Sequence, residues 1–373
     1  MPEAHVKPGP SLDEEKDTPP VLSTGADLLA GYAELHCISN FSFQRGASHP
    51  QELVRRAYDL GYQALALTDE CSVAGVVRAH SALKEYLEFA RKLQEGDPQH
   101  RRVRDFRLLF GSEFDLGDAR LVAIARDLEG WGGLCEFISA ARMGTATKGS
   151  YRVSWAESDF SLLSGCEILY APKREPGGLQ SLCDGLQRAR NLFGSSLWLA
   201  VELLHLLDDD LWLATLREAG ERCGVPLVAA GDVHMHVRSR KPLQDVITAV
   251  RLGKTVPECG FALQGNAERH LRRRARLAET YPPELLAATL EVAARCNFDL
   301  ETIKYDYPLE TVPDGLTPTQ ALHRLTYDGA RRRYPQGVPV RVLTLLRKEL
   351  KLIAECKYEM FFLTVHDLSL IHI

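Results

Sequence analysis

The chain has 373 residues, with 45% hydrophobic and 25% charged side chains and a formal net charge of −5 at pH 7. This length exceeds the usual size of a single core, so we expect one large domain and part of another. The composition argues against a protein that is basic throughout and coats nucleic acid, and no apolar run approaches the ~20 residues that span a bilayer.

The first residues and the cysteines indicate where the protein works. Residues 1–26 are rich in acids and prolines and lack the apolar segment of a signal peptide, so we expect a flexible leader and a cytoplasmic protein. The nine cysteines are scattered from Cys37 to Cys356 and form no CxxC pair. This pattern fits reduced thiols better than a disulfide framework or a zinc site.

The first structural unit is predicted to be strand, helix, strand. Residues 32–38 have the aromatic and aliphatic character of a strand. Ser48–Gln51 has the S-x-x-Q form of a capping box with proline at the first helical position, so a helix should follow. Residues 63–68 predict the next strand, which places Asp69 and Glu70 at its carboxyl end.

The same plan repeats along the first two thirds of the chain. Further strands are predicted at 107–111, 121–125, 197–204 and 226–230, with helices between several of them. Strands that alternate with helices indicate a mainly parallel sheet covered by helices. We therefore predict an α/β fold, with the sheet closed or nearly closed into a barrel whose strand ends meet on one face.

The pattern changes to helices alone in the last third. Helices are predicted at 282–296, 317–333 and 340–356, and the second is opened by the capping box Thr317–Gln320. We place a domain boundary near 257–265. This divides the chain into a barrel domain, 27–260, and a helical segment, 261–373.

Strand-end residues form a candidate metal site. Asp232, His234 and His236 alternate along an extended segment, so their side chains can share one side. His36, Glu70 and Glu113 end other strands, and together these imidazoles and carboxylates suit zinc, manganese or iron. Such an ion would favour phosphoester hydrolysis. The alternative is that His36 is a hydrogen-bonded core histidine and that Asp69 or Asp232 caps a helix.

Arginines cluster late in the chain. The cluster comprises Arg269, Arg272, Arg273, Arg274 and Arg276. Their spacing covers much of the surface of one predicted helix, so we expect any contact with nucleic-acid phosphates to lie there. The alternative is a basic helix that is merely solvated.

Several segments together resemble one family. They are YAELHCISNFSFQRG and the residues that follow it, GSEF, GDVHMHVRSR, ERHLRRRARLAETYPPELL, YPLETVP and YEMFFLTVHD. Over Tyr32–Asp367 the chain resembles the bacterial error-prone DNA polymerases of the DNA polymerase III alpha type. The resemblance implies an N-terminal PHP domain, which is a barrel, followed by a helical connection into the polymerase palm and thumb.

The resemblance also shows departures from an active PHP site. In that site the first motif is H-x-H followed by an acid before glycine, and the second is T-D-H. Here Ile38 stands at the second histidine, Arg45 at the acid and Glu70 at the last position of T-D-H. The implied remnant is His36, Glu70, Glu113, Asp232 and His234. We expect it to hold at most one weakly bound Zn²⁺ or Mn²⁺, without proofreading or phosphatase activity.

The resemblance implies a function at the level of the whole polymerase. The family extends primer–template DNA with deoxynucleotides and Mg²⁺ in damage-induced synthesis, with a sliding clamp and mutagenesis accessory proteins as partners. Its catalytic carboxylates lie in the palm, beyond a Gly/Ser-rich loop. We expect this chain to be an N-terminal part without them, in which Leu368–Ile373 departs from the family pattern. The alternatives are an independent PHP phosphoesterase and a non-catalytic PHP scaffold.

Overall fold

The computed structural model describes residues 31–96, 104–145, 147, 149–174, 178–303 and 312–371. The predicted leader, residues 1–26, lies outside this part of the chain. The described residues form two compact units, one ending at Thr302 and the other beginning at Ile303. No described helix is both long enough and apolar enough to span a bilayer.

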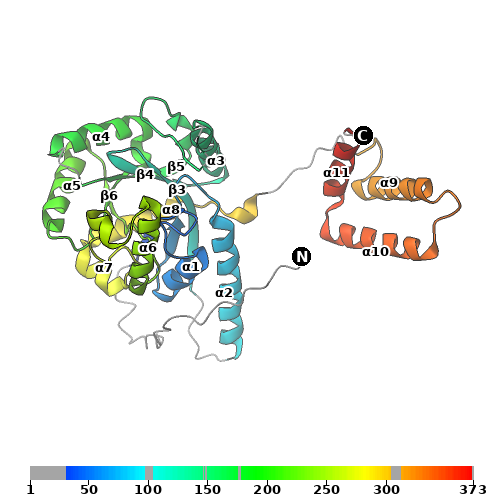
Figure 1. Cartoon of the computed structure of the whole chain (residues 1–373), viewed down its shortest axis with the longest axis horizontal. Coiled ribbons are helices and arrows are strands. Elements are labelled where there is room, and N and C mark those ends of the chain that lie inside the picture. Colours follow the sequence, from blue (N-terminus) through cyan, green and yellow to red (C-terminus); the bar gives the residue numbers. More distant parts are fainter. Residues whose placement is uncertain are drawn as a thin grey trace. The chain divides into compact units, whose positions relative to one another are not determined.

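The first unit is built on a curled sheet of seven strands (Figure 1). The strands follow their sequence order and pair in parallel, except that β4 is antiparallel to both of its neighbours. They are β1 (Ala33–Cys37), β2 (Ala64–Leu67), β3 (Arg107–Asp115), β4 (Ala119–Ala125), β5 (Cys166–Pro172), β6 (Leu197–Val201) and β7 (Leu227–Ala229).

The sheet curls until its last strand approaches its first. The residue Val233, shortly after β7, donates its N–H to the carbonyl of His36 (2.9 Å) and accepts from the N–H of Ile38 (2.9 Å). These two hydrogen bonds join the two edges of the sheet and remove unpaired backbone groups there. The prediction of a mainly parallel, nearly closed α/β barrel is therefore confirmed.

Eight helices of the described chain belong to this unit. They are α1 (Pro50–Asp59), α2 (Val76–Gly96), α3 (Leu128–Met143), α4 (Gly178–Phe193), α5 (Asp209–Cys223), α6 (Lys241–Leu252), α7 (Arg274–Thr280) and α8 (Pro283–Arg295). The cap of α1 differs from the prediction, because its N-cap is His49, whose N–H donates to Glu52 (2.8 Å). The hydroxyl of Ser48 instead contacts His236 (2.8 Å).

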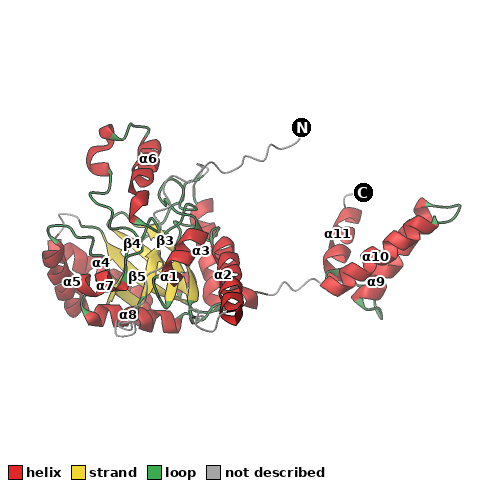
Figure 2. Cartoon of the chain, turned by 90° about the horizontal axis from the view of Figure 1, so that it is seen from below, coloured by secondary structure: helices red, strands yellow, loops and turns green. Residues whose placement is uncertain are grey.

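Helix α8 closes one end of the barrel interior, on the side of the sheet opposite α6 (Figure 2). Its Val292 and Ala293, with Cys296 directly after it, pack with the small and aliphatic side chains that point into the barrel. The Thr289 hydroxyl also accepts the N–H of Ala33 (3.1 Å). The compact unit therefore continues past the boundary expected at 257–265, because the sequence after that boundary supplies the lid of the barrel core.

The second unit contains α9 (Pro318–Arg333), α10 (Val340–Cys356) and α11 (Glu359–Ile371). The predicted capping box opens α9, where Thr317 and Gln320 exchange hydrogen bonds between side chain and backbone. The buried core of this unit is small: Ala321, Leu322, Leu350 and Leu363. Helix α11 continues through Leu368 to Ile371, so the expected departure at Leu368 does not end the helix.

Candidate functional site

Buried polar side chains converge where the parallel strands end. His36 lies on β1, Glu113 on β3, and Glu202 directly after β6. His36 Nε2 lies 2.5 Å from Glu113 Oε2, and His36 Nδ1 lies 2.7 Å from Glu202 Oε1. Because a carboxylate only accepts hydrogen bonds, both ring nitrogens donate and the ring is an imidazolium. Glu113 lies within β3 rather than after it, because pairing with β4 extends this strand to Asp115.

The opposite charges in this cluster shift one another's pKa values so that each group stays ionised. Burial alone would lower the pKa of His36, but the hydrogen bonds to Glu113 and Glu202 outweigh burial and raise this pKa to about 9. Burial alone would raise the pKa of Glu113, yet the charges of Arg45 and Arg120, together with His36, hold it well below its usual value. The pKa of Glu202 is lowered too, because its hydrogen bond to His36 overcomes burial.

Arg45 reaches this cluster from the loop after β1. Its Nη1 pairs with Glu113 and with Glu70 Oε2, the latter at 2.7 Å. The loop is tight: a Cβ on Gly46 would lie 1.9 Å from the carbonyl oxygen of Ser39, so only glycine fits there. The arginine therefore stands between two of the predicted metal ligands.

Asp69 fixes the same loop by hydrogen bonds. Its carboxylate accepts hydrogen bonds from the backbone N–H and hydroxyl of Ser39 (2.7 and 2.8 Å) and from the hydroxyl of Ser42 (2.7 Å). Both carboxylate oxygens are thus used by the loop. Asp69 is a structural residue, as the alternative reading of the sequence allowed, although it fixes the β1 loop rather than capping a helix.

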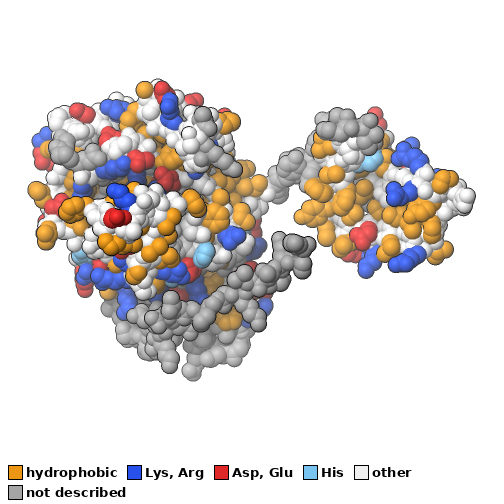
Figure 3. Space-filling view, viewed as in Figure 1, with side chains coloured by type: hydrophobic (Ala, Val, Ile, Leu, Met, Phe, Trp, Pro, Cys, Tyr) orange, Lys and Arg blue, Asp and Glu red, His pale blue; other side chains and the backbone are white. Residues whose placement is uncertain are grey.

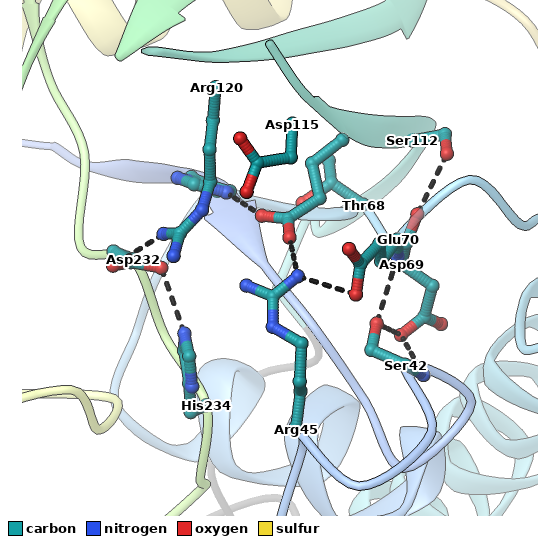
Figure 4. A network of polar contacts seen from close by, with 12 residues as sticks. Ser42, Arg45, Thr68, Asp69, Glu70, Ser112, Asp115, Arg120, Asp232 and His234 are labelled. Atoms are coloured by element: carbon teal, nitrogen blue, oxygen red, sulfur yellow. Dashed lines mark hydrogen bonds and ion pairs between the residues drawn. The ribbon is translucent and has the colours of Figure 1, made fainter. Parts of the chain in front are cut away.

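Asp232 is the second centre of charge (Figure 4). Its Oδ2 accepts from Arg120 Nη1 (3.1 Å) and pairs with Arg269, while Oδ1 lies 2.9 Å from His234 Nε2. Gln264 donates to the other ring nitrogen of His234 (3.1 Å). Asp232 has a left-handed backbone (φ 43°), which costs a non-glycine residue roughly 1–3 kcal/mol and is typical of functional sites.

The predicted ligand set is brought together only in part. His36, Glu113 and Asp232 offer ligand atoms within 4.8 Å of one another, and they are the only such group among the described residues. Glu70 instead pairs with Arg45 and accepts from the Tyr151 hydroxyl (2.9 Å). His236 lies outside the site, against Ser48.

The donor chemistry does not fit a bound divalent cation. Both ring nitrogens of His36 are bonded to carboxylates, and both oxygens of Glu113 are bonded to cations. The Oδ2 of Asp232 is shared by two guanidinium groups. A metal here would have to displace hydrogen bonds at every ligand and would face several fixed positive charges. The arrangement instead links the strand ends by charge-assisted hydrogen bonds.

Sequence reasoning missed three members of this network. Glu202 is a single acid at the end of an apolar run, and only its strand-end position could have marked it. Arg120 lies on β4, which is antiparallel to its neighbours. The prediction considered only residues at the carboxyl ends of parallel strands, so it did not include Arg120. Arg269 was assigned to nucleic acid, but it pairs with Asp232 because its segment folds back, and its carbonyl accepts the N–H of His234 (2.9 Å).

The prediction that the five arginines of the cluster lie on the surface of one helix is wrong. Helix α7 begins only at Arg274, so Arg269, Arg272 and Arg273 precede it. Arg272 is 2% exposed. Its guanidinium donates to the carbonyl of Leu203 (3.0 Å) and to the hydroxyl of Tyr281 (3.1 Å). Of the five arginines, only Arg273 and Arg276 are exposed, and Arg276 pairs with Glu279 (3.6 Å).

Family models match both parts of the chain. Residues 34–164 match the PHP domain, so the barrel is a PHP domain. Residues 320–371 match the bacterial DNA polymerase III alpha NTPase domain. A solved amidohydrolase from Chromobacterium violaceum aligns with 55% of this chain and 88% of its own, at 16% identity and a TM-score of 0.39.

Curated relatives identify the family. Error-prone DNA polymerases from Azoarcus sp. (strain BH72), Dechloromonas aromatica (strain RCB) and Pseudomonas paraeruginosa (strain DSM 24068 / PA7) are 49%, 48% and 47% identical over 90–91% of this chain. The chain belongs to the error-prone DNA polymerase family. It spans about a third of the length of these relatives, 31–32%.

We expect the imidazole of His36 to carry a proton on both ring nitrogens at neutral pH. Both of its ring N–H protons should persist in nitrogen-detected NMR spectra up to about pH 9, whereas burial and the charges of Arg45 and Arg120 keep His234 neutral at pH 7. The signals can be assigned by their loss in His36→Gln. An imidazole that loses its proton near pH 6.5 would contradict the geometry.

The unfolding free energy of the chain should depend on pH through the protonation of His36. The folded pKa of His36 lies above its ordinary value of 6.5, so its contribution is complete below pH 6.5 and is lost as pH rises through about 9. The difference in unfolding free energy between the unaltered chain and His36→Gln should therefore shrink over that range. A difference that grows with pH would show that His36 is neutral in the folded protein.

Proposed function

We propose that these residues are part of an error-prone DNA-directed DNA polymerase that extends primer–template DNA with deoxynucleotides in damage-induced synthesis and repair. The identity of 47–49% over nine tenths of the chain carries this proposal. The chain spans about a third of its relatives, so we assign the catalytic carboxylates and Mg²⁺ to the rest of the protein. A sliding clamp and mutagenesis accessory proteins are the proposed partners, and the cytoplasm the proposed location.

Primer extension tests the proposal. The protein encoded by the complete gene should extend a primer with deoxynucleotides and Mg²⁺, and the 373-residue chain should not. Failure of the complete protein on an undamaged template would count against a polymerase. Extension by the 373-residue chain alone would show that its catalytic residues lie here.

Within that protein we propose a non-catalytic role for the PHP barrel. The network of His36, Glu113 and Asp232 with three arginines supports this role, because it fixes β1, β3 and the segment after β7 to one another. An independent phosphoesterase is the weaker candidate, since Arg45 Nη1 already bonds the Glu113 carboxylate that a metal would need.

The two candidates differ in hydrolysis of p-nitrophenyl phosphate. With added Mn²⁺ or Zn²⁺, the chain should release p-nitrophenol no faster than Glu113→Gln, because neither protein can assemble a metal-bound hydroxide. Turnover that requires metal and disappears in His234→Ala would establish the phosphoesterase instead.

We propose that the helical unit connects the barrel to the polymerase palm and thumb. The match of residues 320–371 to the polymerase model supports this assignment. Several large apolar side chains of the unit are exposed, among them Tyr358, Phe361, Phe362 and Val365. Figure 3 shows apolar side chains over much of the visible face of this unit. A unit with so small a core would gain stability from a further surface that covers them.

Any contact of this chain with DNA phosphates should use Arg273 and Arg276, the exposed members of the arginine cluster. Replacing both with glutamine should weaken binding of double-stranded DNA and reduce the slope of log affinity against log salt by about 0.9 per lost contact. Replacing Arg217 and Arg222, two exposed arginines on α5, is the matched control. An unchanged slope in Arg273→Gln/Arg276→Gln would show that these two arginines do not contact DNA phosphates.

A further inference from the structure

A pocket of about 310 Å³ lies on the outside of the barrel, between helices α4 and α5 and the end of β5. The two helices lie side by side (Figure 1). Much of the wall of the pocket is apolar, and its apolar residues include Leu179, Leu182, Leu211 and Trp212. No residue of the charged network described above lines this pocket, so the two are separate features of the barrel.

A buried hydroxyl belongs to the lining of the pocket. Tyr170 of β5 is only 2% exposed, and its hydroxyl forms no hydrogen bond with any residue that the structure describes. Gly185 of α4 leaves room for this hydroxyl, because a Cβ on that glycine would lie 2.3 Å from its oxygen. Proteins seldom leave a buried polar group without a partner. Whatever occupies the pocket therefore supplies the partner of Tyr170.

Asp118 determines the charge of the pocket. The other charged residues of the lining are paired: Lys173 with Asp115 (2.7 Å), Asp208 with Arg174 (2.7 Å) and Glu218 with Arg222 (2.5 Å). The carboxylate of Asp118, in the turn between β3 and β4, forms no ion pair or hydrogen bond within the described part of the chain. Burial and the charge of Asp118 raise the pKa of the Tyr170 hydroxyl, so that hydroxyl stays neutral. The pocket thus favours a ligand group with one positive charge.

Exposed leucines continue the apolar surface outside the pocket. Leu211 lines the pocket and is 71% exposed. Leu206 and Leu207 directly precede Asp208 of the lining, and both are exposed, Leu207 completely. Large apolar side chains that cluster at the surface indicate a site for a protein partner. A free cation would leave these leucines in water.

We propose that this pocket binds an arginine side chain of a partner protein, in a segment whose neighbouring side chains are apolar. The guanidinium would donate to the Asp118 carboxylate and to the oxygen of the Tyr170 hydroxyl. Its methylene stem would pack against the apolar wall, as long basic side chains do. The apolar neighbours of the arginine would cover Leu207 and Leu211.

Saturation-transfer NMR titrations of the 373-residue chain test this proposal with three probes. The first is the peptide acetyl-Ser-Leu-Arg-Leu-Ser-amide. The second is the same peptide with citrulline in place of arginine, which keeps the shape of the side chain but removes its charge. The third is ethylguanidinium chloride, which presents the charged group without a peptide. Ionic strength is held constant throughout.

We expect saturable binding of the arginine peptide, with weaker binding of the citrulline peptide and of ethylguanidinium. Asp118→Asn should weaken the arginine peptide about fivefold, the upper end for a partly exposed ion pair, and should leave the citrulline peptide unchanged. Asp105→Asn, at an exposed aspartate outside the pocket, is the matched control and should change neither. Leu211→Ala should weaken both peptides, whereas Leu192→Ala, at an exposed leucine of α4 outside the lining, should not.

Three results would overturn the proposal. Absence of saturable binding of the arginine peptide would show that the pocket takes no such segment. Equal affinity for the arginine and citrulline peptides, or binding of the arginine peptide that survives Asp118→Asn, would show that no cationic side chain is recognised. Ethylguanidinium that binds as tightly as the arginine peptide would identify a free organic cation as the occupant in place of a partner protein. These outcomes do not depend on polymerase activity.

Discussion

Replacing Glu113 with alanine is expected to lower the free energy of unfolding of the barrel by about 3–5 kcal/mol, the usual cost of removing one partner from a buried ion pair. Glu113 is 1% exposed and bonds both His36 and Arg45. Without it, two buried positive charges face each other with one acceptor fewer. The change is therefore larger than the loss of a single contact.

Urea denaturation followed by tryptophan fluorescence measures this effect. Trp131, Trp155, Trp198 and Trp212 are all of the tryptophans in the chain, and all lie in the barrel unit, so fluorescence reports on that unit. The control is Glu136→Ala, at an exposed acid of α3, which should change the unfolding free energy by no more than about 0.5 kcal/mol. Equal stability of the two variants would show that the network carries no net stabilisation.

Replacing Arg272 with alanine should lower the unfolding free energy by about 3 kcal/mol or more. Its guanidinium donates to the carbonyl of Leu203 and to the Tyr281 hydroxyl, and lies 5.4 Å from the centre of the Tyr281 ring. The Tyr281 hydroxyl in turn donates to the carbonyl of Ala230 (2.8 Å). Arg272 thereby ties the ends of two strands to the segment before α8.

The adjacent Arg273 supplies a matched comparison, because it is exposed. Arg273→Ala should change the unfolding free energy by no more than about 0.5 kcal/mol. DNA binding should respond in the opposite order, with Arg273→Ala weakening it and Arg272→Ala leaving the affinity of the folded fraction unchanged. An Arg272→Ala variant that is fully stable but has lost DNA binding would restore the nucleic-acid assignment.

The sequence predicted the fold because the fold rests on local patterns. Short apolar runs alternate with amphipathic segments, which is enough to indicate a parallel barrel. It also predicted that His36, Glu113 and Asp232 would meet, since strand ends share one face of such a barrel. Arg45 stands at a position where an active PHP site has an acid, and its pairing with Glu113 fits the expectation of a weakened metal centre, which stays a prediction.

The remaining members of the site depend on contacts between distant segments. Nothing around Arg120 distinguishes it from a solvent-facing arginine on a strand, and its role follows from Asp232, 112 residues away. The run that contains Arg269 and Arg272 has helical spacing, but tertiary partners decide its structure: Asp232 pairs with the first arginine and the Leu203 carbonyl accepts from the second. Local propensity yields to such partners.

Metal analysis of the purified chain tests most directly whether guanidinium groups have taken the place of a metal at this centre. After purification without chelators, zinc and manganese should be found at well below one ion per chain, and added Zn²⁺ or Mn²⁺ should not raise the unfolding midpoint of the barrel. One or more tightly bound ions per chain, lost on replacing Asp232 with asparagine, would contradict this account.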